Sequence, residues 1–184
     1  YRQIVPVDLT QFGRYRLIRR INLGGMAEVF KAKSYDPVAF EKIVALKRLL
    51  PTVAENADFV AMFLQEAKIA AFLKHPNICP IFELGQVGES YYITMEFLYG
   101  HDLRQVFKAS RTKNRPINPW LVAWLGEKVA EGLDYAYNRA HVDNKVLGVV
   151  HRDISPQIIM IGFVGSVKII DFGIAKAAIS AVQT

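Results

Sequence analysis

The first half of the chain contains short apolar-rich runs between turn residues, which predict strands, and 15–21 alternates weakly between apolar and polar residues with a period of two. The predicted strands cover 15–21, 28–34, 42–49, 78–87 and 90–98, with Gly, Pro and Asp residues at the turns. Between the third and fourth strands, apolar residues recur every three or four positions from Asn56 to Leu73. We therefore expect one helix there, ended by His75-Pro76-Asn77.

The second half of the chain has mainly helical periods. We expect a short helix at 103–109 and a long one that starts at the cap Asn118, has Pro119 in its first position, and ends near Arg139. Its apolar stripe is predicted to include Val122 and Leu125. Short strands are expected at 158–161 and 167–170. The pattern predicts an α+β fold of two lobes, 13–98 and 99–184, with a hinge near 97–100.

Composition narrows the class of protein. With 184 residues, 52% hydrophobic and 22% charged, the chain suits a globular protein with its own core. No apolar run reaches the roughly 18–20 residues that span a bilayer. The chain starts at Tyr1, so we expect the true N-terminus to be missing and any membrane link to lie outside this sequence. The single cysteine, Cys79, excludes an internal disulfide and is expected to be buried, as fits a reducing, cytoplasmic setting.

The net charge of +6 is concentrated in two basic clusters, at 14–20 and 104–115. A nucleic-acid surface is one interpretation, but aromatic residues are not interleaved with the clusters and no nucleic-acid motif accompanies them. We therefore predict no nucleic-acid partner. Solvated basic faces, or a docking surface for an acidic partner, fit the pattern better.

Two charges interrupt the apolar pattern. Lys47 is the only charge on a strand face shared with Ala45 and Leu49, and Glu66 lies within the apolar stripe of the first helix. Burying either charge alone costs several kcal/mol, so each is predicted to be the partner of the other. The alternative is that Lys47 extends to solvent and Glu66 lies at the margin of the stripe.

Two turns carry residues suited to phosphate and metal. Gly24-Gly25 lies between two predicted strands, where small residues let backbone N–H groups approach phosphate oxygens. Asp171 opens the triplet Asp171-Phe172-Gly173 after an apolar strand, and its carboxylate is a suitable ligand for Mg²⁺. An ordinary hairpin turn and an ordinary Asp-X-Gly turn are the alternatives.

In order along the chain, these motifs resemble the eukaryotic-type protein kinases, specifically the bacterial serine/threonine kinases. The motifs span 13–176 and are Gly24-Gly25-Met26-Ala27-Glu28-Val29, Val44-Ala45-Leu46-Lys47, Glu66, His75-Pro76-Asn77-Ile78, Met95-Glu96-Phe97-Leu98, His151-Arg152-Asp153 and Asp171-Phe172-Gly173. The resemblance implies an N-lobe of antiparallel sheet plus one helix and a mainly helical, incomplete C-lobe. No GxxxxGK[ST] loop is present in the sequence, so a P-loop fold is not supported.

The resemblance also implies a role for individual positions. Lys47 would pair with the nucleotide phosphates and Glu66, Asp153 would orient the acceptor hydroxyl and take its proton, and Asp171 would hold Mg²⁺. The nucleotide-binding positions would be Asn22, Gly24, Gly25, Ala27, Val29, Ala45, Lys47, Met95, Glu96, Leu98 and Asp102. The implied activity is ATP-dependent transfer of the γ-phosphate to a serine or threonine of a protein substrate, with ATP and Mg²⁺ as cofactors.

The sequence departs from the family pattern at three positions. Asn22 stands where the first glycine is usual, Ser155 replaces a lysine, and Ile158 replaces the asparagine that binds a second Mg²⁺. Isoleucine has no lone pair to offer a metal. This favours an alternative, a pseudokinase-type module that binds nucleotide or a partner and transfers little phosphate. Because the motifs stop after Asp171-Phe172-Gly173, we also expect a fragment of a larger kinase domain, in which the apolar face of the 118–139 helix lacks part of its cover. Ser180 and Thr184 are candidate phosphoacceptors.

Overall fold

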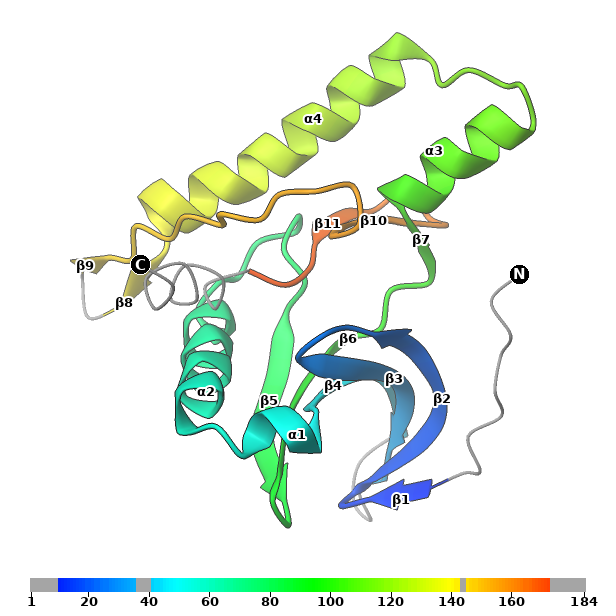
Figure 1. The fold of residues 1–184 in the computed structure, drawn as a ribbon. Helices are drawn as coiled ribbons and strands as arrows, with labels where there is room; N and C mark the ends of the chain where they lie inside the picture. Colours follow the sequence, from blue (N-terminus) through cyan, green and yellow to red (C-terminus); the bar gives the residue numbers. More distant parts are fainter. Residues whose placement is uncertain (1–9, 36–40, 143–144, 173–184) are drawn as a thin grey trace. The chain divides into compact units, whose positions relative to one another are not determined.

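The computed structural model describes residues 10–35, 41–142 and 145–172, and these divide into two compact units (Figure 1). Unit 1 contains the described residues up to Lys68 together with Ile81–Phe97. Unit 2 contains Ile69–Pro80 together with the described residues from Leu98 onward. The last division falls at the predicted hinge, whereas the sequence pattern had grouped 69–80 with the first lobe.

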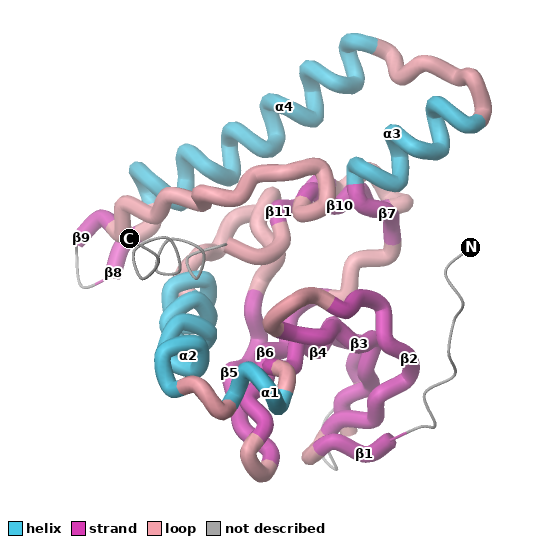
Figure 2. The backbone as a smooth tube through the Cα atoms, viewed as in Figure 1, coloured by secondary structure: helices cyan, strands magenta, loops and turns pink. Residues whose placement is uncertain are grey.

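Unit 1 is built on a six-stranded antiparallel sheet, shown in magenta in Figure 2. The strand order is β1-β2-β3-β4-β6-β5. The strands are β1 (Thr10–Phe12), β2 (Tyr15–Leu23), β3 (Ala27–Ser34), β4 (Lys42–Leu49), β5 (Ile81–Val87) and β6 (Ser90–Glu96). The apolar-rich runs predicted all of them except β1, whose three residues are too few to form such a run.

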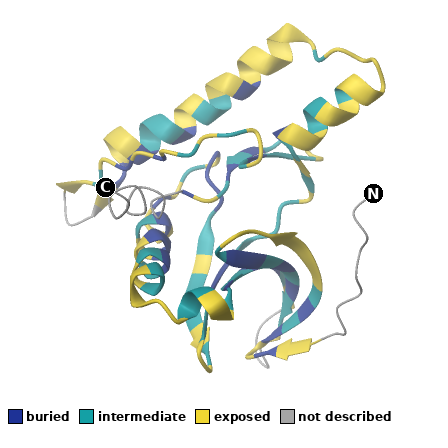
Figure 3. Cartoon of the chain, viewed as in Figure 1, coloured by how far each residue is buried: buried dark blue, intermediate teal, exposed yellow. Residues whose placement is uncertain are grey.

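The two faces of this sheet carry different side chains. One face carries an apolar cluster that includes Phe30, Leu46 and Tyr92, and Figure 3 shows this part of the sheet as buried. Because side chains alternate along a strand, the intervening residues Val29 and Lys47 lie on the opposite face. The sheet thus separates its main core from the face that carries the lysine.

The helices of unit 1 follow β4. Pro51 ends the strand as predicted and also begins a short helix, α1 (Pro51–Ala54). The second helix, α2 (Ala57–Ala71), starts after Asn56, whose side chain accepts a hydrogen bond from the backbone N–H of Asp58 at 2.9 Å. Phe63 and Ala67 of α2 form an apolar cluster with Leu49 and Ile93 of the sheet. This packing sets the helix against the sheet face that carries Lys47.

Unit 2 combines helices with short strands. Its elements are β7 (Gly100–Asp102), α3 (Leu103–Thr112), α4 (Pro119–Asp134), a π-helical turn η1 (Tyr135–Arg139), β8 (His141–Val142), β9 (Lys145–Val146), β10 (Ile159–Gly162) and β11 (Val167–Ile169). Strands β11, β10 and β7 form a sheet in that order. Asn118 caps α4 by accepting the N–H of Trp120 at 2.9 Å, as predicted. No helix in the described ranges is both long and apolar enough to cross a membrane.

The apolar stripe of α4 is buried from Leu125 onward. Leu125 is buried in a cluster with Leu103 and Ile159, and Ala136 of η1 is completely buried. Val122 is 45% exposed and its neighbours Trp120 and Trp124 are exposed as well, which agrees with the expectation that part of this face lacks its cover. The apolar clusters that bury the stripe from Leu125 onward include residues of α3, β10 and β11.

Candidate active site

Lys47 and Glu66 form an ion pair inside unit 1. Lys47 Nζ lies 3.4 Å from Glu66 Oε1, and the two side chains are 13% and 9% exposed. Strand β4 places the lysine between Val29 of β3 and Ile93 of β6, and α2 brings the glutamate to it. The predicted ion pair between Lys47 and Glu66 is therefore present. The alternative, in which Lys47 extends to solvent and Glu66 lies at the margin of the apolar stripe, is wrong.

The glycine turn between β2 and β3 is closed by backbone hydrogen bonds. The N–H of Gly24 donates to the carbonyl of Ala27 at 2.9 Å, and the N–H of Leu50 donates to the carbonyl of Met26 at 3.0 Å. Neither Gly24 nor Gly25 has a left-handed φ, so the backbone does not require glycine at these positions. A Cβ on Gly25 would meet nothing within 4 Å, which leaves open space over the turn.

Small and apolar residues surround Lys47 on its face of the sheet. Val29 pairs with Lys47 across β3 and β4, and Ala45 pairs with Met95 across β4 and β6. Ala27 and Ala45 are both buried. Asn22 pairs with Val29 at the exposed end of β2. Val29, Ala45 and Met95 thus share the face of Lys47, whereas Glu96, which ends β6, pairs with Val44 on the face of the core cluster.

Asp102, the predicted ribose-binding residue, has a structural role in unit 2 that the sequence analysis did not anticipate. It is the cap of α3, and its Oδ1 accepts the backbone N–H of Gln105 at 2.7 Å. The signal was available in principle, because aspartate is one of the preferred residues directly before a helix. Leu98, another of the predicted nucleotide-binding residues, also belongs to unit 2.

The loop that carries Asp153 is organised around a buried histidine. The backbone N–H of Asp153 donates to His151 Nδ1 at 3.3 Å, and the intervening Arg152 adopts a left-handed φ of 62°. The His151 ring packs 4.7 Å from the ring of Phe172. Burial lowers the pKa of His151 more than the neighbouring carboxylates of Asp171 and Asp153 raise it. A neutral imidazole with its proton on Nε2 follows, and Nε2 has no hydrogen-bond partner among the described residues.

Asp171 and Phe172 point in different directions from the end of the β11 segment. Asp171 has a left-handed φ of 64° and an exposed side chain, whereas Phe172 is only 2% exposed. The φ of Asp171 is uncommon for a residue with a side chain. Gly173, Ser180 and Thr184 lie outside the described residues.

Ile158 is part of the apolar packing of unit 2. It contacts the cluster that contains Ile169 and Phe172, and its carbonyl accepts the N–H of Ile170 at 2.9 Å. Its side chain fills hydrophobic space at the position where the family resemblance expects a metal-binding amide. Within the described ranges, no group of three or more His, Cys, Asp or Glu side chains is placed to hold a metal.

A second buried charge network, which the sequence analysis missed, supports the glycine turn. Glu28 is 6% exposed, and its Oε1 accepts hydrogen bonds from Arg48 Nη2 at 2.6 Å and Arg48 Nε at 3.0 Å. Arg20 lies 3.5 Å from the other carboxylate oxygen. The Arg48 guanidinium also packs over the rings of Phe12 and Phe30. Alternation along β3 puts Glu28 on the same face as Phe30. A charged residue on the core face of a strand was therefore the sequence feature that could have revealed this network.

Comparisons with known proteins agree on one family. The family profile described as protein kinase domain matches residues 15–184. The tyrosine-protein kinase MasK of Myxococcus xanthus is 42% identical over 181 residues, which are 98% of this chain and 28% of MasK. The serine/threonine-protein kinase PrkC of Bacillus subtilis is 35% identical over 172 residues, which are 94% of this chain and 24% of PrkC.

The same likeness extends to solved structures. The kinase domain of Mycobacterium tuberculosis PknI is 27% identical with a TM-score of 0.70, and the match covers 91% of this chain and 63% of that domain. The chain thus spans roughly a quarter of the length of its curated relatives and less than two thirds of a solved kinase domain. The motif order, the curled sheet with its lysine–glutamate pair and the family profile lead to one assignment: the chain belongs to the protein kinase domain family.

Proposed function

We propose that this chain is the nucleotide-binding and phosphotransfer part of an ATP-dependent protein serine/threonine kinase. The observation that carries the proposal is the Lys47–Glu66 ion pair, with 3.4 Å between its charged atoms, on a sheet face lined by small apolar residues. Phosphoryl transfer passes through a loose transition state whose charge is spread over the phosphate oxygens. Protein catalysis of this step therefore consists mainly of positioning and of supplying positive charge.

The residues of unit 1 fit the parts of ATP. Lys47 would hold the α- and β-phosphates, since Glu66 fixes the position of its ammonium group. Open space at Gly25 suits the approach of a phosphate oxygen, whereas the Gly24 N–H already donates to the Ala27 carbonyl. Val29 and Ala45, with Met95 beside them, offer an apolar surface for adenine, and the backbone groups of Glu96 and Leu98 would pair with its polar edge. One oxygen of Asp102 caps α3, and its second oxygen would accept a ribose hydroxyl.

Asp153 would act as the base. Its carboxylate would accept a hydrogen bond from the acceptor hydroxyl and take the proton as the oxygen–phosphorus bond forms and the bond from the γ-phosphorus to the bridging oxygen breaks. The bond from the Asp153 N–H to His151 Nδ1 needs a neutral imidazole, which burial of His151 favours. His151 is thus a positioning residue for this loop.

The residues of unit 2 fit one magnesium ion better than two. The exposed carboxylate of Asp171 would hold Mg²⁺, which when bound neutralises charge on the phosphates. Ile158 has no donor atom and packs into an apolar cluster. This observation favours the second candidate function, a pseudokinase-type module in which nucleotide binding is retained and transfer is slower by orders of magnitude.

The proposal also specifies which type of residue accepts the phosphate. The loop sequence His151-Arg152-Asp153-Ile154-Ser155-Pro156-Gln157 does not match the tyrosine-kinase form of this loop, which favours serine or threonine. PrkC, named a serine/threonine kinase, supports this choice, and MasK, named a tyrosine kinase, makes tyrosine the class to test against it.

The test uses the full-length protein with ATP and either Mg²⁺ or Mn²⁺, and peptides that offer serine, threonine or tyrosine. We expect the native protein to label serine and threonine peptides above the background of a Lys47→Met variant, and Ile158→Asn to raise the rate. Activity only in the Ile158→Asn form would establish the pseudokinase reading. No phosphate transfer by either the native protein or Ile158→Asn would refute the enzyme proposal. Thermal stabilisation by ATP–Mg²⁺ should be weakened in Asp171→Asn, and an unchanged shift would reject Asp171 as the metal ligand.

A further inference from the structure

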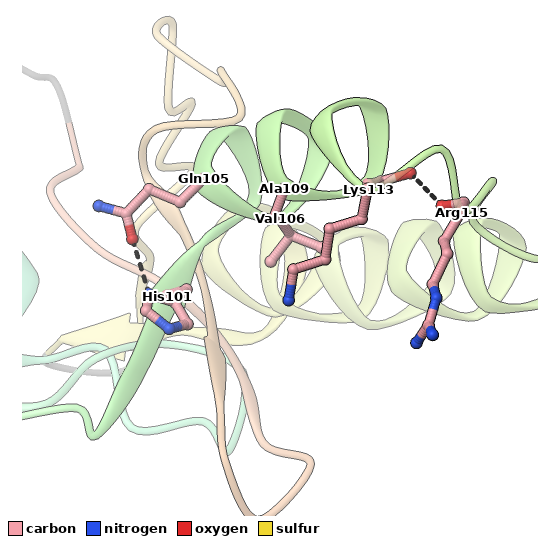
Figure 4. A pocket seen from close by; sticks show the side chains of 7 residues that line it. His101, Gln105, Val106, Ala109, Lys113 and Arg115 are labelled. Atoms are coloured by element: carbon pink, nitrogen blue, oxygen red, sulfur yellow. Dashed lines mark hydrogen bonds between the residues drawn. The ribbon is translucent and has the colours of Figure 1, made fainter. Parts of the chain in front are cut away.

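The described part of unit 2 contains a cavity of about 590 Å³ on one face of α3 (Figure 4). Residues on the turns of α3 and just after it line the cavity, including His101, Val106, Ala109, Ser110, Lys113 and Arg115. The size falls in the range of ligand-binding pockets, about 300–1,000 Å³. We call this cavity the α3 pocket. None of the roles proposed for phosphotransfer uses its lining residues.

The α3 pocket is positively charged. Among the described residues that line it, Lys113 and Arg115 are cationic and none is acidic. The surrounding sequence from 103 to 118 contains five basic residues and no acidic one. The acidic residue directly before this stretch, Asp102, uses Oδ1 to cap α3. A ligand with negative charge therefore complements the pocket.

The end of α3 is shaped so that both cations lie on the pocket. Asn114 has a left-handed φ of 48°, which turns the chain back after the helix. The N–H of Arg115 donates to the carbonyl of Ser110 at 3.0 Å, and the Ser110 hydroxyl donates to the carbonyl of Arg115. The carbonyls of Ala109 and Arg111 also accept backbone N–H groups. These bonds fix the backbone that carries the cations and satisfy the carbonyls that would otherwise repel an anion.

An apolar surface adjoins the other end of the pocket. The ring of His101 makes an edge contact with Phe163, with 5.4 Å between the ring centroids. Phe163 and Val164, in the turn between β10 and β11, are 72% and 94% exposed. The ten residues of α3 rise by about 15 Å, which an extended peptide covers in about five residues. The surface thus presents an apolar site and a cationic site separated by a short peptide length.

We propose that the α3 pocket docks an acidic peptide segment of a partner protein. The segment places an apolar side chain against Phe163 and Val164, and carboxylates about five residues away bind Lys113 and Arg115. Among the described residues that line the pocket, His101 is the only one with an aromatic ring, and that ring already contacts Phe163, so the pocket lacks the series of rings on which successive nucleic-acid bases stack. A peptide with mixed apolar and acidic side chains therefore fits the surface better than a nucleic acid. Docking here does not depend on phosphotransfer.

The experiment measures binding of fluorescent peptides to the full chain by anisotropy. The probe peptide has phenylalanine, a Gly/Ser spacer of about five residues and three glutamates, and is made in both orders. The control peptide has glutamine in place of glutamate. The test variant is Lys113→Glu with Arg115→Glu, and Lys113→Gln with Arg115→Gln is its milder form. The matched variant is Arg19→Glu with Lys145→Glu, which changes the net charge equally at two exposed positions that do not line the α3 pocket.

We expect one order of the probe peptide to bind, and the charge reversal at the pocket to weaken binding at least tenfold. The matched variant should change it less than threefold. Phe163→Ser should weaken binding about fivefold, and Phe72→Ser, at another exposed aromatic residue, should not. Equal losses in both charge-reversal variants, or equal binding of the control peptide, would overturn the proposal. A single-stranded DNA that binds as tightly and displaces the peptide would assign the pocket to phosphate backbones instead.

Discussion

Replacing Arg48 with methionine removes the main partner of a buried carboxylate. Glu28 is 6% exposed, and two of its hydrogen bonds come from the Arg48 guanidinium, at 2.6 and 3.0 Å. After the replacement Arg20 is the one ion-pair partner of the carboxylate left among the described residues, at 3.5 Å. Methionine keeps the apolar contact with Phe12 and Phe30, so the change tests mainly the loss of charge and hydrogen bonds.

The expected cost follows from this geometry. Breaking a buried ion pair costs about 3–5 kcal/mol, and the lower end applies because the Arg48 side chain is 25% exposed. We expect a loss of about 3 kcal/mol in the free energy of unfolding for Arg48→Met. Glu28→Gln should cost about 1 kcal/mol, since Arg48 can turn to water. The double variant should cost about 2 kcal/mol, because it leaves no buried charge unpaired.

Urea unfolding followed by circular dichroism measures all four proteins. The cycle should give a coupling energy of about 2 kcal/mol between Glu28 and Arg48. The melting temperature of Arg48→Met should fall by about 6–12 °C for a chain of this size. A coupling energy below about 0.5 kcal/mol would show that the pair adds nothing specific and would refute the reasoning.

Three further changes test other parts of the fold. Gly85→Ala would place a Cβ 2.5 Å from Tyr92 Oη, so we expect the free energy of unfolding, measured in urea, to fall by about 1–3 kcal/mol. The control Gly126→Ala meets open space and should not lower the free energy of unfolding. Burial raises the pKa of Glu83, but hydrogen bonds from tyrosine and arginine lower it by a larger amount. The pKa therefore lies below its ordinary value. Its contribution is therefore complete above about pH 4.3 and is lost as the pH falls through the lowered pKa; Glu83→Gln should flatten the acid limb of a melting-temperature profile. Asp102→Ala should cost about 1 kcal/mol by loss of the α3 cap, and Asp102→Asn should retain most of it. An unchanged acid limb, or equal stability of the two Asp102 variants, would contradict these assignments.

The strands of the large sheet that could be predicted are its longer ones, with seven to nine residues each between turn residues. Strands β3, β4 and β6 pack one side on the core cluster around Leu46, and β4 and β6 also bury Leu49 and Ile93 on the other side. Strands β1, β7, β8 and β9 have two or three residues each and carry no period to detect. A helical stripe indicates which side is apolar but not which segment covers it, so the sequence predicted that part of the α4 stripe is uncovered but not that the uncovered part includes Val122.

The candidate site was predictable where a charge contradicted its surroundings. Lys47 and Glu66 each interrupted an apolar pattern, so their pairing followed from the cost of burial. The α3 pocket was not predictable in the same way, since Lys113 and Arg115 share it only because Asn114 turns the chain back. The basic cluster was visible in the sequence, but its geometry depends on the hydrogen bonds of Ser110 with Arg115.

The packing of Ile158 also limits what a restored metal ligand can achieve. The Ile158→Asn variant would place an amide at a half-buried position against the cluster that contains Ile169 and Phe172. The shorter polar side chain loses the apolar contacts that the isoleucine makes there, and any of its polar atoms left without a partner would cost about 1–3 kcal/mol more. Stability and metal binding therefore make opposite demands on this one side chain.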